Sequence, residues 1–392
     1  MKTPLPQREK RDSKWKQVHQ YIMDMIRSGS YQPGQTLPTL RSLAAEFDTS
    51  ITPVVQAMRI LEKEGLVELV RGHGCRVRNI AMNDNMVVVR PIVEVIGISA
   101  EPDLQRRSHT VAGLQLGILQ VLGLTGDIKT HMTSISSVSN PYALDSILRE
   151  IGTQRPDGLI IGPVAPYLEQ QIAKLWQIKS SGTKVVLFAS HHPLERFDRV
   201  TSDFVGGQKQ LTEHLCKKGH KEFLRISFGL HAHFEQLKQE GFRQGLEASG
   251  FDPSLAKSST IEITIGDETE EVRKERLERI IGALAVILKQ RKISVIMAGN
   301  DAQAGEIRAA LHILERHDIE TTGYDGFWDE LVGEIEERYG SHVLKEGPPV
   351  SVDTNLVECG NHMARLLLGR IKGELPNEAQ NHLIPQDLII PR

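Results

Sequence analysis

The sequence lacks the features that mark several large classes of protein. Its 392 residues contain three cysteines, Cys75, Cys216 and Cys359. An odd number of scattered cysteines is typical of free thiols in a reducing compartment rather than of a disulfide framework. No apolar run approaches the length that crosses a membrane, and the segment from Met1 to Lys16 is polar and charged, unlike a signal peptide. We therefore expect a cytoplasmic protein.

The sequence also lacks the motifs of common enzymes. It contains no Gly-X-Gly-X-X-Gly, no Walker loop, no Gly-X-Ser-X-Gly and no His-Glu-X-X-His. Two histidine pairs, His191-His192 and His231-X-His233, have no carboxylate or cysteine partner at the spacing of metal ligands. We expect no catalytic activity, no cofactor and no bound metal.

Charge is distributed unevenly along the chain. Residues 1–80 contain 13 Lys and Arg against 8 Asp and Glu, whereas the whole chain has a net charge of −3. A basic N-terminal module on an acidic protein is typical of a DNA-binding domain joined to another domain. A solvated surface would give the same excess, so charge alone does not establish DNA binding.

Residues 14–80 contain the order of elements found in a winged helix-turn-helix. Apolar residues from Trp15 to Ile26 recur at steps of three and four, which places them on one face of a helix. Leu37-Pro38-Thr39 begins a second, short helix with Thr39 as its N-cap. Ser50 is the expected N-cap of a third helix, and two short strands then join across Arg71-Gly72-His73-Gly74.

An ordered set of residues within this segment is more informative than any one member. The set consists of Gly29, Pro33-Gly34, Leu37-Pro38, Arg41, Leu43-Ala44, Ser50, Val54, Ala57, Leu61-Glu62, Glu64-Gly65-Leu66 and Gly72-X-Gly74. In this order the residues resemble the GntR family of bacterial transcription regulators. The resemblance implies that the third helix enters the major groove of DNA and that the hairpin contacts the minor groove or the backbone.

The resemblance also implies which side chains contact DNA. The family usually has Arg directly after the capping serine and again four residues later. This sequence has Ile51 and Val55 there, and neither can make a bidentate contact to guanine. The operator is therefore expected to differ from the common half-site of the family. The candidate DNA-contacting residues are Arg41, Ser50, Thr52, Gln56, Arg71 and His73.

The rest of the chain alternates between strand-like and helical patterns. Residues 81–91 carry no helix or turn pattern and are expected to form an extended linker. From residue 92 to residue 392 the alternation predicts parallel sheets covered on both faces. Two successive α/β halves of similar size predict a two-lobed core of the periplasmic-binding-protein type.

Ordered segments in this second part support that interpretation. They are Pro156-Asp157-Gly158-Leu159-Ile160, Val200-X-X-Asp203 with Gly206-Gly207, Gly299-Asn300-Asp301, Gly323-Tyr324-Asp325 and Pro349-Val350-Ser351-Val352. They resemble the effector-binding core of the LacI family. Together with the N-terminal module, the chain resembles the GntR/LacI hybrid regulators of the arabinose-repressor type. That resemblance implies a DNA affinity set by a small molecule, most often a sugar.

The LacI resemblance points to four ligand-binding residues. Asp203, Asn300 and Asp325 each follow an expected strand, and their carboxylates and amide suit the hydroxyls of a sugar. Lys238 occupies the position where the family has Arg. Its ammonium keeps the positive charge but cannot make the two parallel hydrogen bonds of a planar guanidinium. Each of these side chains could instead cap a helix or lie in a solvated loop. Weaker candidates are Glu101 and His191.

One segment departs from the LacI pattern. Residues 327–347 replace a short loop of the family, and Phe327 to Tyr339 is expected to form an extra acidic helix. Phe327 or Trp328 could supply the aromatic face that a sugar site needs. The segment could equally line the mouth of the cleft or a dimer face.

These patterns together predict a sequence-specific transcription regulator. We expect a homodimer joined by residues 92–392, which binds double-stranded operator DNA and acts as a repressor released by a carbohydrate effector. The alternatives are a ligand-dependent activator and a cytoplasmic sugar-binding protein that does not bind DNA.

Overall fold

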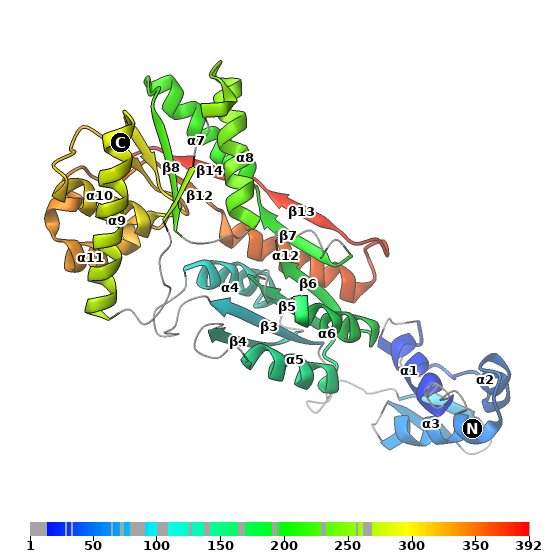
Figure 1. Cartoon of the computed structure of the whole chain (residues 1–392). Coiled ribbons are helices and arrows are strands. Elements are labelled where there is room, and N and C mark those ends of the chain that lie inside the picture. The colour runs from blue at the N-terminus through cyan, green and yellow to red at the C-terminus, as the bar shows by residue number, and fades with distance from the viewer. Residues whose placement is uncertain are drawn as a thin grey trace, which may run out of the picture. The chain divides into compact units, whose positions relative to one another are not determined.

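The structure is a computed structural model of two compact units, Met1–Val89 and Arg90–Arg392 (Figure 1). It describes residues 14–27, 30–32, 34–63, 66–70, 74–78, 91–99, 109–124, 128–136, 142–163, 169–189, 194, 196–228, 233–255, 258–261 and 269–391. The candidate residues Arg71 and His73, and residues 81–90 of the expected linker, lie outside this description.

The first unit contains a small helical core and a hairpin. Its elements are α1 Lys14–Arg27, α2 Leu40–Glu46, α3 Ile51–Lys63, β1 Val67–Val70 and β2 Gly74–Val77. The apolar face predicted for the first helix is buried at Val18 and Ile22, against Leu43 of α2 and Val54 and Leu61 of α3. The predicted helices and strands of this unit are therefore confirmed.

The backbone before α2 is fixed to the hairpin of the first unit. β1 and β2 pair antiparallel, with Val67 opposite Val77. The amide N–H of Leu37 donates to the carbonyl of Cys75 at 2.8 Å, and that of Gly34 donates to the carbonyl of Val77 at 2.9 Å. Thr39 then caps α2, because its hydroxyl accepts the Ser42 N–H at 3.1 Å. The hairpin and the two helices that follow Gly34 therefore form one rigid piece.

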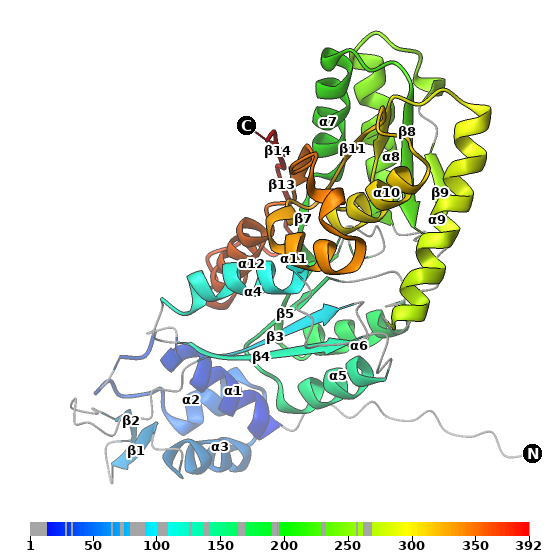
Figure 2. The same ribbon diagram turned by 90° about the vertical axis from the view of Figure 1, so that its left-hand side faces the viewer.

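The second unit has two lobes. The described strands of the first lobe form a six-stranded parallel sheet in the order β13-β7-β6-β5-β3-β4. These strands are β3 Ile92–Ser99, β4 Lys129–Ser136, β5 Gly158–Gly162, β6 Lys184–Phe188, β7 Asp198–Ser202 and β13 Asn381–Ile384. Helices α4 His109–Leu122 and α12 Leu356–Lys372 cover one face. Helices α5 Ala143–Gln154 and α6 Glu169–Ser180 cover the other (Figure 2).

The second lobe is a smaller parallel sheet surrounded by helices. The described strands follow the order β11-β10-β8-β9. The strands are β8 Phe223–Phe228, β9 Ser258–Ile261, β10 Val295–Met297 and β11 Glu320–Thr322, with a separate antiparallel pair, β12 Ser351–Asp353 and β14 Asp387–Ile389. The helices are α7 Phe204–Lys218, α8 His233–Ala248, α9 Glu270–Gln290, α10 Asp301–Ile313 and α11 Trp328–Tyr339, with short turns η3 Pro253–Leu255 and η4 Ser341–Leu344. The predicted fold class, a winged helix-turn-helix followed by a two-lobed α/β core, is confirmed.

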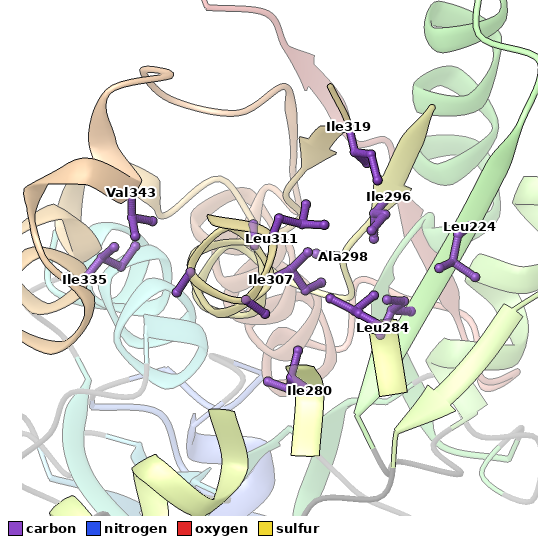
Figure 3. Close-up of a cluster of buried hydrophobic side chains, with 14 of the residues drawn as sticks. Leu224, Ile280, Leu284, Ile296, Ala298, Ile307, Leu311, Ile319, Ile335 and Val343 are labelled. Carbon is purple, nitrogen blue, oxygen red and sulfur yellow. The ribbon is translucent and has the colours of Figure 1, made fainter. Parts of the chain in front are cut away.

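The extra segment forms the helix that the sequence predicts, α11, followed by η4. Figure 3 shows Ile307 and Leu311 of α10 between the strand residue Ile296 on one side and Ile335 and Val343 of the extra segment on the other. Because Ile335 and Val343 are each 3 % exposed, the segment belongs to the core of the second lobe.

The chain passes between the lobes at three places in its described part, after β7, after β12 and after β13. Hydrogen bonds join these crossings to one another. The Ser202 hydroxyl donates to the Thr354 carbonyl at 2.6 Å, and the Asp203 N–H donates to the Ile384 carbonyl at 2.8 Å. The Asn355 amide donates to the Pro385 carbonyl at 2.8 Å. No helix in the described residues is long and apolar enough to span a bilayer.

Candidate functional site

Helix α3 of the first unit has one buried and one exposed face. Val54, Ala57, Met58 and Leu61 are buried at 0–1 % exposure. The predicted contact residues are on the exposed side: Ser50, Thr52 and Gln56. An exposed polar row at the start of a helix, on a helix anchored by its opposite face, can be presented to the edges of bases in a groove.

Two further features of the first unit bear on this face. Arg41 is exposed in the first turn of α2, the helix that precedes α3. Ile51, the first residue of α3, is 44 % exposed, so an apolar side chain lies beside the polar row where the GntR pattern has Arg. Among the described residues, the predicted contact residues Arg41, Ser50, Thr52 and Gln56 are thus exposed together with Ile51.

A cavity of about 210 Å³ lies between the two lobes of the second unit. At roughly 30 Å³ for each water in the liquid, it has room for about seven waters, or for one small sugar. Both lobes contribute to its wall. The lining residues are Thr110, Pro163 and Phe188 of the first lobe, Phe204, Phe234, Glu235, Lys238, Gly299, Asn300, Gln303 and Asp325 of the second, and Thr354 and Leu356 at a crossing.

Asp325 supplies an acceptor to this cavity. It follows β11, and its backbone N–H donates to the Val352 carbonyl at 2.8 Å. Its φ of 93° is unusual for a residue other than glycine. Burial raises the pKa of its carboxyl, and the Lys238 ammonium acts in the opposite direction. A carboxylate surrounded by protein but open to a cavity needs donors from whatever occupies that cavity.

Asn300 and Gln303 supply donors. The Asn300 Oδ1 accepts the Gln303 N–H at 2.8 Å, which caps α10. The Gln303 Oε1 in turn accepts the Gly299 N–H at 3.1 Å. Because both amide oxygens are engaged in this cap, their NH₂ groups are the parts left to contact a ligand. The combination of NH₂ donors with the acceptor Asp325 fits hydroxyl groups, which accept and donate at the same time.

Lys238 lies on the cavity wall but is engaged by the protein. Its Nζ donates to the Gly299 carbonyl at 2.8 Å and lies 3.8 Å from the centroid of the Tyr324 ring. It also lies 5.7 Å from the Phe204 ring and 5.4 Å from the Phe234 ring. With 2 % exposure, the ammonium fixes two rings of the wall rather than projecting into the cavity.

Asp203 is used in a different way from the other three candidates. Its carboxylate accepts the Gly206 N–H at 2.9 Å and caps α7. It is not among the residues that line the cavity. The structure thus brings Asn300, Lys238 and Asp325 together, while Asp203 serves the helix-cap role that its sequence context also allowed.

The aromatic surface of the cavity differs from the expected one. Phe204 and Phe234 line the wall together, with ring centroids 5.8 Å apart. Trp328 instead is 6 % exposed, in the core, with the Arg308 guanidinium 4.9 Å from its ring centroid. Phe327 is not part of the cavity wall either. The weaker candidates Glu101 and His191 lie outside the described residues, as do His192 and His231.

Sequence reasoning missed Phe204, Phe234 and Gln303 as parts of the cavity wall. Phe204 directly follows Asp203, and Phe234 begins the helix that carries Lys238. Nothing in the local pattern shows that α7 and α8 bring these rings together. Gln303, by contrast, carries a local signal, because an Asn followed three residues later by Gln is the pattern of a reciprocal helix cap.

Family models match both units of the chain. Residues 14–77 match the model of bacterial regulatory proteins of the gntR family. Residues 129–392 match the model of periplasmic binding proteins and the sugar binding domain of the LacI family.

Individual relatives match parts of the chain. An uncharacterised HTH-type transcriptional regulator of Streptomyces coelicolor is 42 % identical over 65 residues, 17 % of this chain and 24 % of its own length. The HTH-type transcriptional regulator CelR of Thermobifida fusca is 28 % identical over 192 residues, 46 % of this chain and 48 % of its own length. The alignments thus span less than half of each of these relatives.

A solved structure described as a complex of the transcriptional regulator CelR with cellobiose has a similar fold. It covers 90 % of this chain and 99 % of its own, with a TM-score of 0.56 and 19 % identity. At this identity the likeness shows the fold.

Proposed function

We propose that this chain, which belongs to the family of periplasmic binding proteins and LacI sugar binding domains and carries a gntR-family module, is a transcription regulator controlled by a carbohydrate effector. The observation that carries the proposal is the cavity wall, which includes Asp325, Asn300, Gln303 and three phenylalanines. Carboxylate and amide groups suit hydroxyls, and phenyl rings suit the apolar C–H face of a sugar ring. We infer that such a regulator acts by binding DNA and effector, without catalysing a reaction. Its place of action is then the cytoplasm, where bacterial DNA is located.

The proposal is tested by DNA binding with and without sugars. Fragments of the gene's own upstream region are screened by gel shift, and the fragment bound most tightly serves as the operator. Operator affinity is then measured by fluorescence anisotropy with cellobiose and a panel of monosaccharides. We expect one sugar to change operator affinity about 5- to 150-fold, the usual range of coupling between two sites. A chain that binds no upstream fragment would contradict the proposal.

We favour a repressor that the effector releases from DNA, by analogy with both families. β3 begins at Ile92, directly after the expected linker 81–91. If a change in the arrangement of the lobes re-orients the two linkers in a dimer, the recognition helices no longer match the half-site spacing of the operator. A ligand can shift DNA affinity only by as much as it prefers one arrangement over another. Stronger operator binding in the presence of the effector would favour the activator instead.

Alanine substitutions at Arg41 and Gln56 are expected to weaken DNA binding in different ways. Losing a phosphate contact at Arg41 should weaken binding to every sequence and reduce the salt slope by about one unit. Losing a base contact at Gln56 should cost roughly 1–3 kcal/mol on the operator and little on random DNA. Anisotropy titrations of operator and random duplexes at several salt concentrations measure both effects. Gln20→Ala, which removes an exposed glutamine of α1, is the control.

If both substitutions cause equal losses on operator and random DNA, the assignment of Arg41 to phosphate and Gln56 to bases is wrong. If neither changes binding, the exposed face of α3 does not contact DNA.

We also propose that the chain forms a homodimer through the first lobe, because one recognition helix reads too few base pairs for useful specificity. Helix α4 exposes Leu116 and Leu119 at 51 % and 46 %, and β4 is an edge strand of the sheet. Sedimentation equilibrium should show a dimer at micromolar concentration, and Leu116→Glu should shift it to the monomer. Val286→Glu, on α9 of the second lobe and 56 % exposed, should leave the dimer intact. A monomeric wild-type chain would contradict this prediction.

A further inference from the structure

The turn Asp325–Phe327 connects the cavity to the contact between the lobes. Asp325 lines the cavity. Two residues later, Phe327 packs against the hydrophobic core of the second lobe and also against the core of the first lobe beneath α4 and α12. Its ring stacks on that of His109, the first residue of α4, with centroids 4.8 Å apart and planes at 26°. One short turn therefore contacts the ligand space at one end and the opposite lobe at the other.

The turn is held in a conformation that few sequences adopt. Asp325 and Gly326 have φ values of 93° and 79°. A Cβ at Gly326 would lie 3.2 Å from the Cα of Asp353 and 3.1 Å from the Cδ1 of Ile389, and its φ would strain any other residue. A non-glycine residue at positive φ persists only where its surroundings fix it. The positions of Asp325 and Phe327 are therefore tied to one another.

Asp301 is the side chain that fixes the turn. One of its carboxylate oxygens accepts the Phe327 N–H at 2.6 Å, and the other accepts the Ser351 hydroxyl at 2.6 Å. The side chain is buried, with 1 % exposure. Burial raises the pKa of its carboxyl to about 7, and the hydrogen bonds from Ser351 and Phe327 act in the opposite direction. Asp301 is the first residue of α10 and follows Asn300. The start of α10 therefore holds both Asn300 and the turn that carries Asp325.

Phe327 is held in place by the extra segment that follows it. Trp328, the next residue, starts α11 and is buried in the second lobe. The guanidinium of Arg308 lies over its ring and donates to the Gly347 carbonyl at 2.6 Å. The contact with His109 is thus made by a segment in which this chain departs from the LacI pattern.

We propose that Phe327 couples effector binding to the arrangement of the lobes, with His109 as its partner and Asp301 as the residue that positions it. This inference rests on the proposed function. In the present arrangement the cavity wall includes Thr110, which follows His109, and Asp325, which precedes the stacked ring. The stack therefore favours the arrangement that completes the cavity. An effector that contacts the cavity walls of both lobes favours the arrangement in which the rings of Phe327 and His109 are stacked. Because the coupling is reciprocal, loss of the stacked pair lowers effector affinity.

A double-mutant cycle on the full chain tests the coupling, with cellobiose as the probe and calorimetry as the measurement. We expect Phe327→Ala and His109→Ala each to weaken cellobiose binding about tenfold, and the double variant to weaken it by about the same factor. His109→Phe, which keeps a ring for stacking, should retain most of the affinity. Leu344→Ala is the matched control, because Leu344 of the same segment packs on the second-lobe core. It should change the affinity less than about twofold.

Hydrogen exchange supplies a readout that needs no ligand. Phe327→Ala should increase exchange in the first turns of α4, on the other lobe, and Leu344→Ala should not. A hundredfold loss in the double variant, or unchanged exchange in α4 of Phe327→Ala, would overturn the inference. Failure of the wild-type chain to bind cellobiose or any monosaccharide of the panel counts against the proposed effector class. In that case the exchange measurement decides the inference by itself.

Discussion

Replacing Asp325 with alanine is expected to lower effector affinity about a hundredfold while leaving operator binding without effector unchanged. Hydrogen bonds to a charged group contribute roughly 1.5–3 kcal/mol each, and here the acceptor lies out of bulk water. Calorimetry measures the affinity, and anisotropy measures the response of the operator complex. Because alanine at a φ of 93° adds strain, Asp325→Asn is the second variant. Asparagine tolerates positive φ, and it removes the charge and replaces one acceptor oxygen by an NH₂ donor.

Asp203→Ala is the matched control for this experiment. Its carboxylate caps α7 and does not line the cavity, so its loss should cost about 1 kcal/mol of stability and leave effector affinity unchanged. If Asp325→Asn binds the effector as tightly as the wild type, the pocket lies elsewhere. If Asp203→Ala lowers effector affinity, Asp203 contacts the effector as the LacI resemblance implies, and the cavity wall described above lacks one of the residues that bind it.

Replacing Arg370 with methionine is expected to destabilise the second unit by about 3–5 kcal/mol, the usual effect of removing one partner of a buried ion pair. The Nε and Nη2 atoms of Arg370 each lie 2.7 Å from an oxygen of Asp198. The two side chains are 11 % and 7 % exposed. Without the guanidinium, the Asp198 carboxylate is left buried with the Gln380 N–H as a hydrogen-bond donor. Urea unfolding followed by circular dichroism measures the change.

The control for the ion pair is Arg365→Met on the same helix. Arg365 pairs with Glu358, and the two side chains are 58 % and 47 % exposed. Exposed pairs contribute about 0–1 kcal/mol, because water and salt screen them. Equal unfolding midpoints for Arg370→Met and Arg365→Met would show that burial of the Asp198 pair contributes nothing to stability.

The sequence predicted those parts of the fold that depend on local pattern. The apolar stripe of α1, the cap at Thr39 and the extra helix α11 follow from spacing within a few turns of chain, and the structure has all three. The LacI-like segments placed Asn300 and Asp325 correctly near one another, because each follows the carboxyl end of a parallel strand and such ends meet at one edge of the sheet.

The rest of the cavity depends on contacts between distant elements. Phe204 and Phe234 meet because α7 packs on α8. The Lys238 ammonium lies over both rings and holds them in place. The family pattern predicts a ligand contact for Asp203, and its carboxylate also accepts the Gly206 N–H three residues later, which is the geometry of a helix cap. A local pattern cannot choose between a cap and a ligand when both satisfy the same oxygen.

The position of β13 also had no local signal. Residues 381–384 follow α12 within the first lobe and add an edge strand to its sheet, where Asn381 pairs with Arg199 and Ile384 pairs with Ser202 of β7. A short strand that joins a sheet begun almost three hundred residues earlier is specified by tertiary packing rather than by its own sequence.

The late position of β13 in the chain sets the order in which the parts of the protein can fold during synthesis. The first unit is contiguous, so it can complete its core while the ribosome is still translating the lobes. The sheet of the first lobe cannot gain its edge strand β13 until residue 384 has left the ribosome. A nascent chain, or one ended by a premature stop codon before residue 381, would therefore possess the DNA-binding fold without a complete first lobe. Errors near the end of the gene are then expected to produce chains with a folded DNA-binding unit but an incomplete first lobe, and therefore without the dimer that specific operator binding requires.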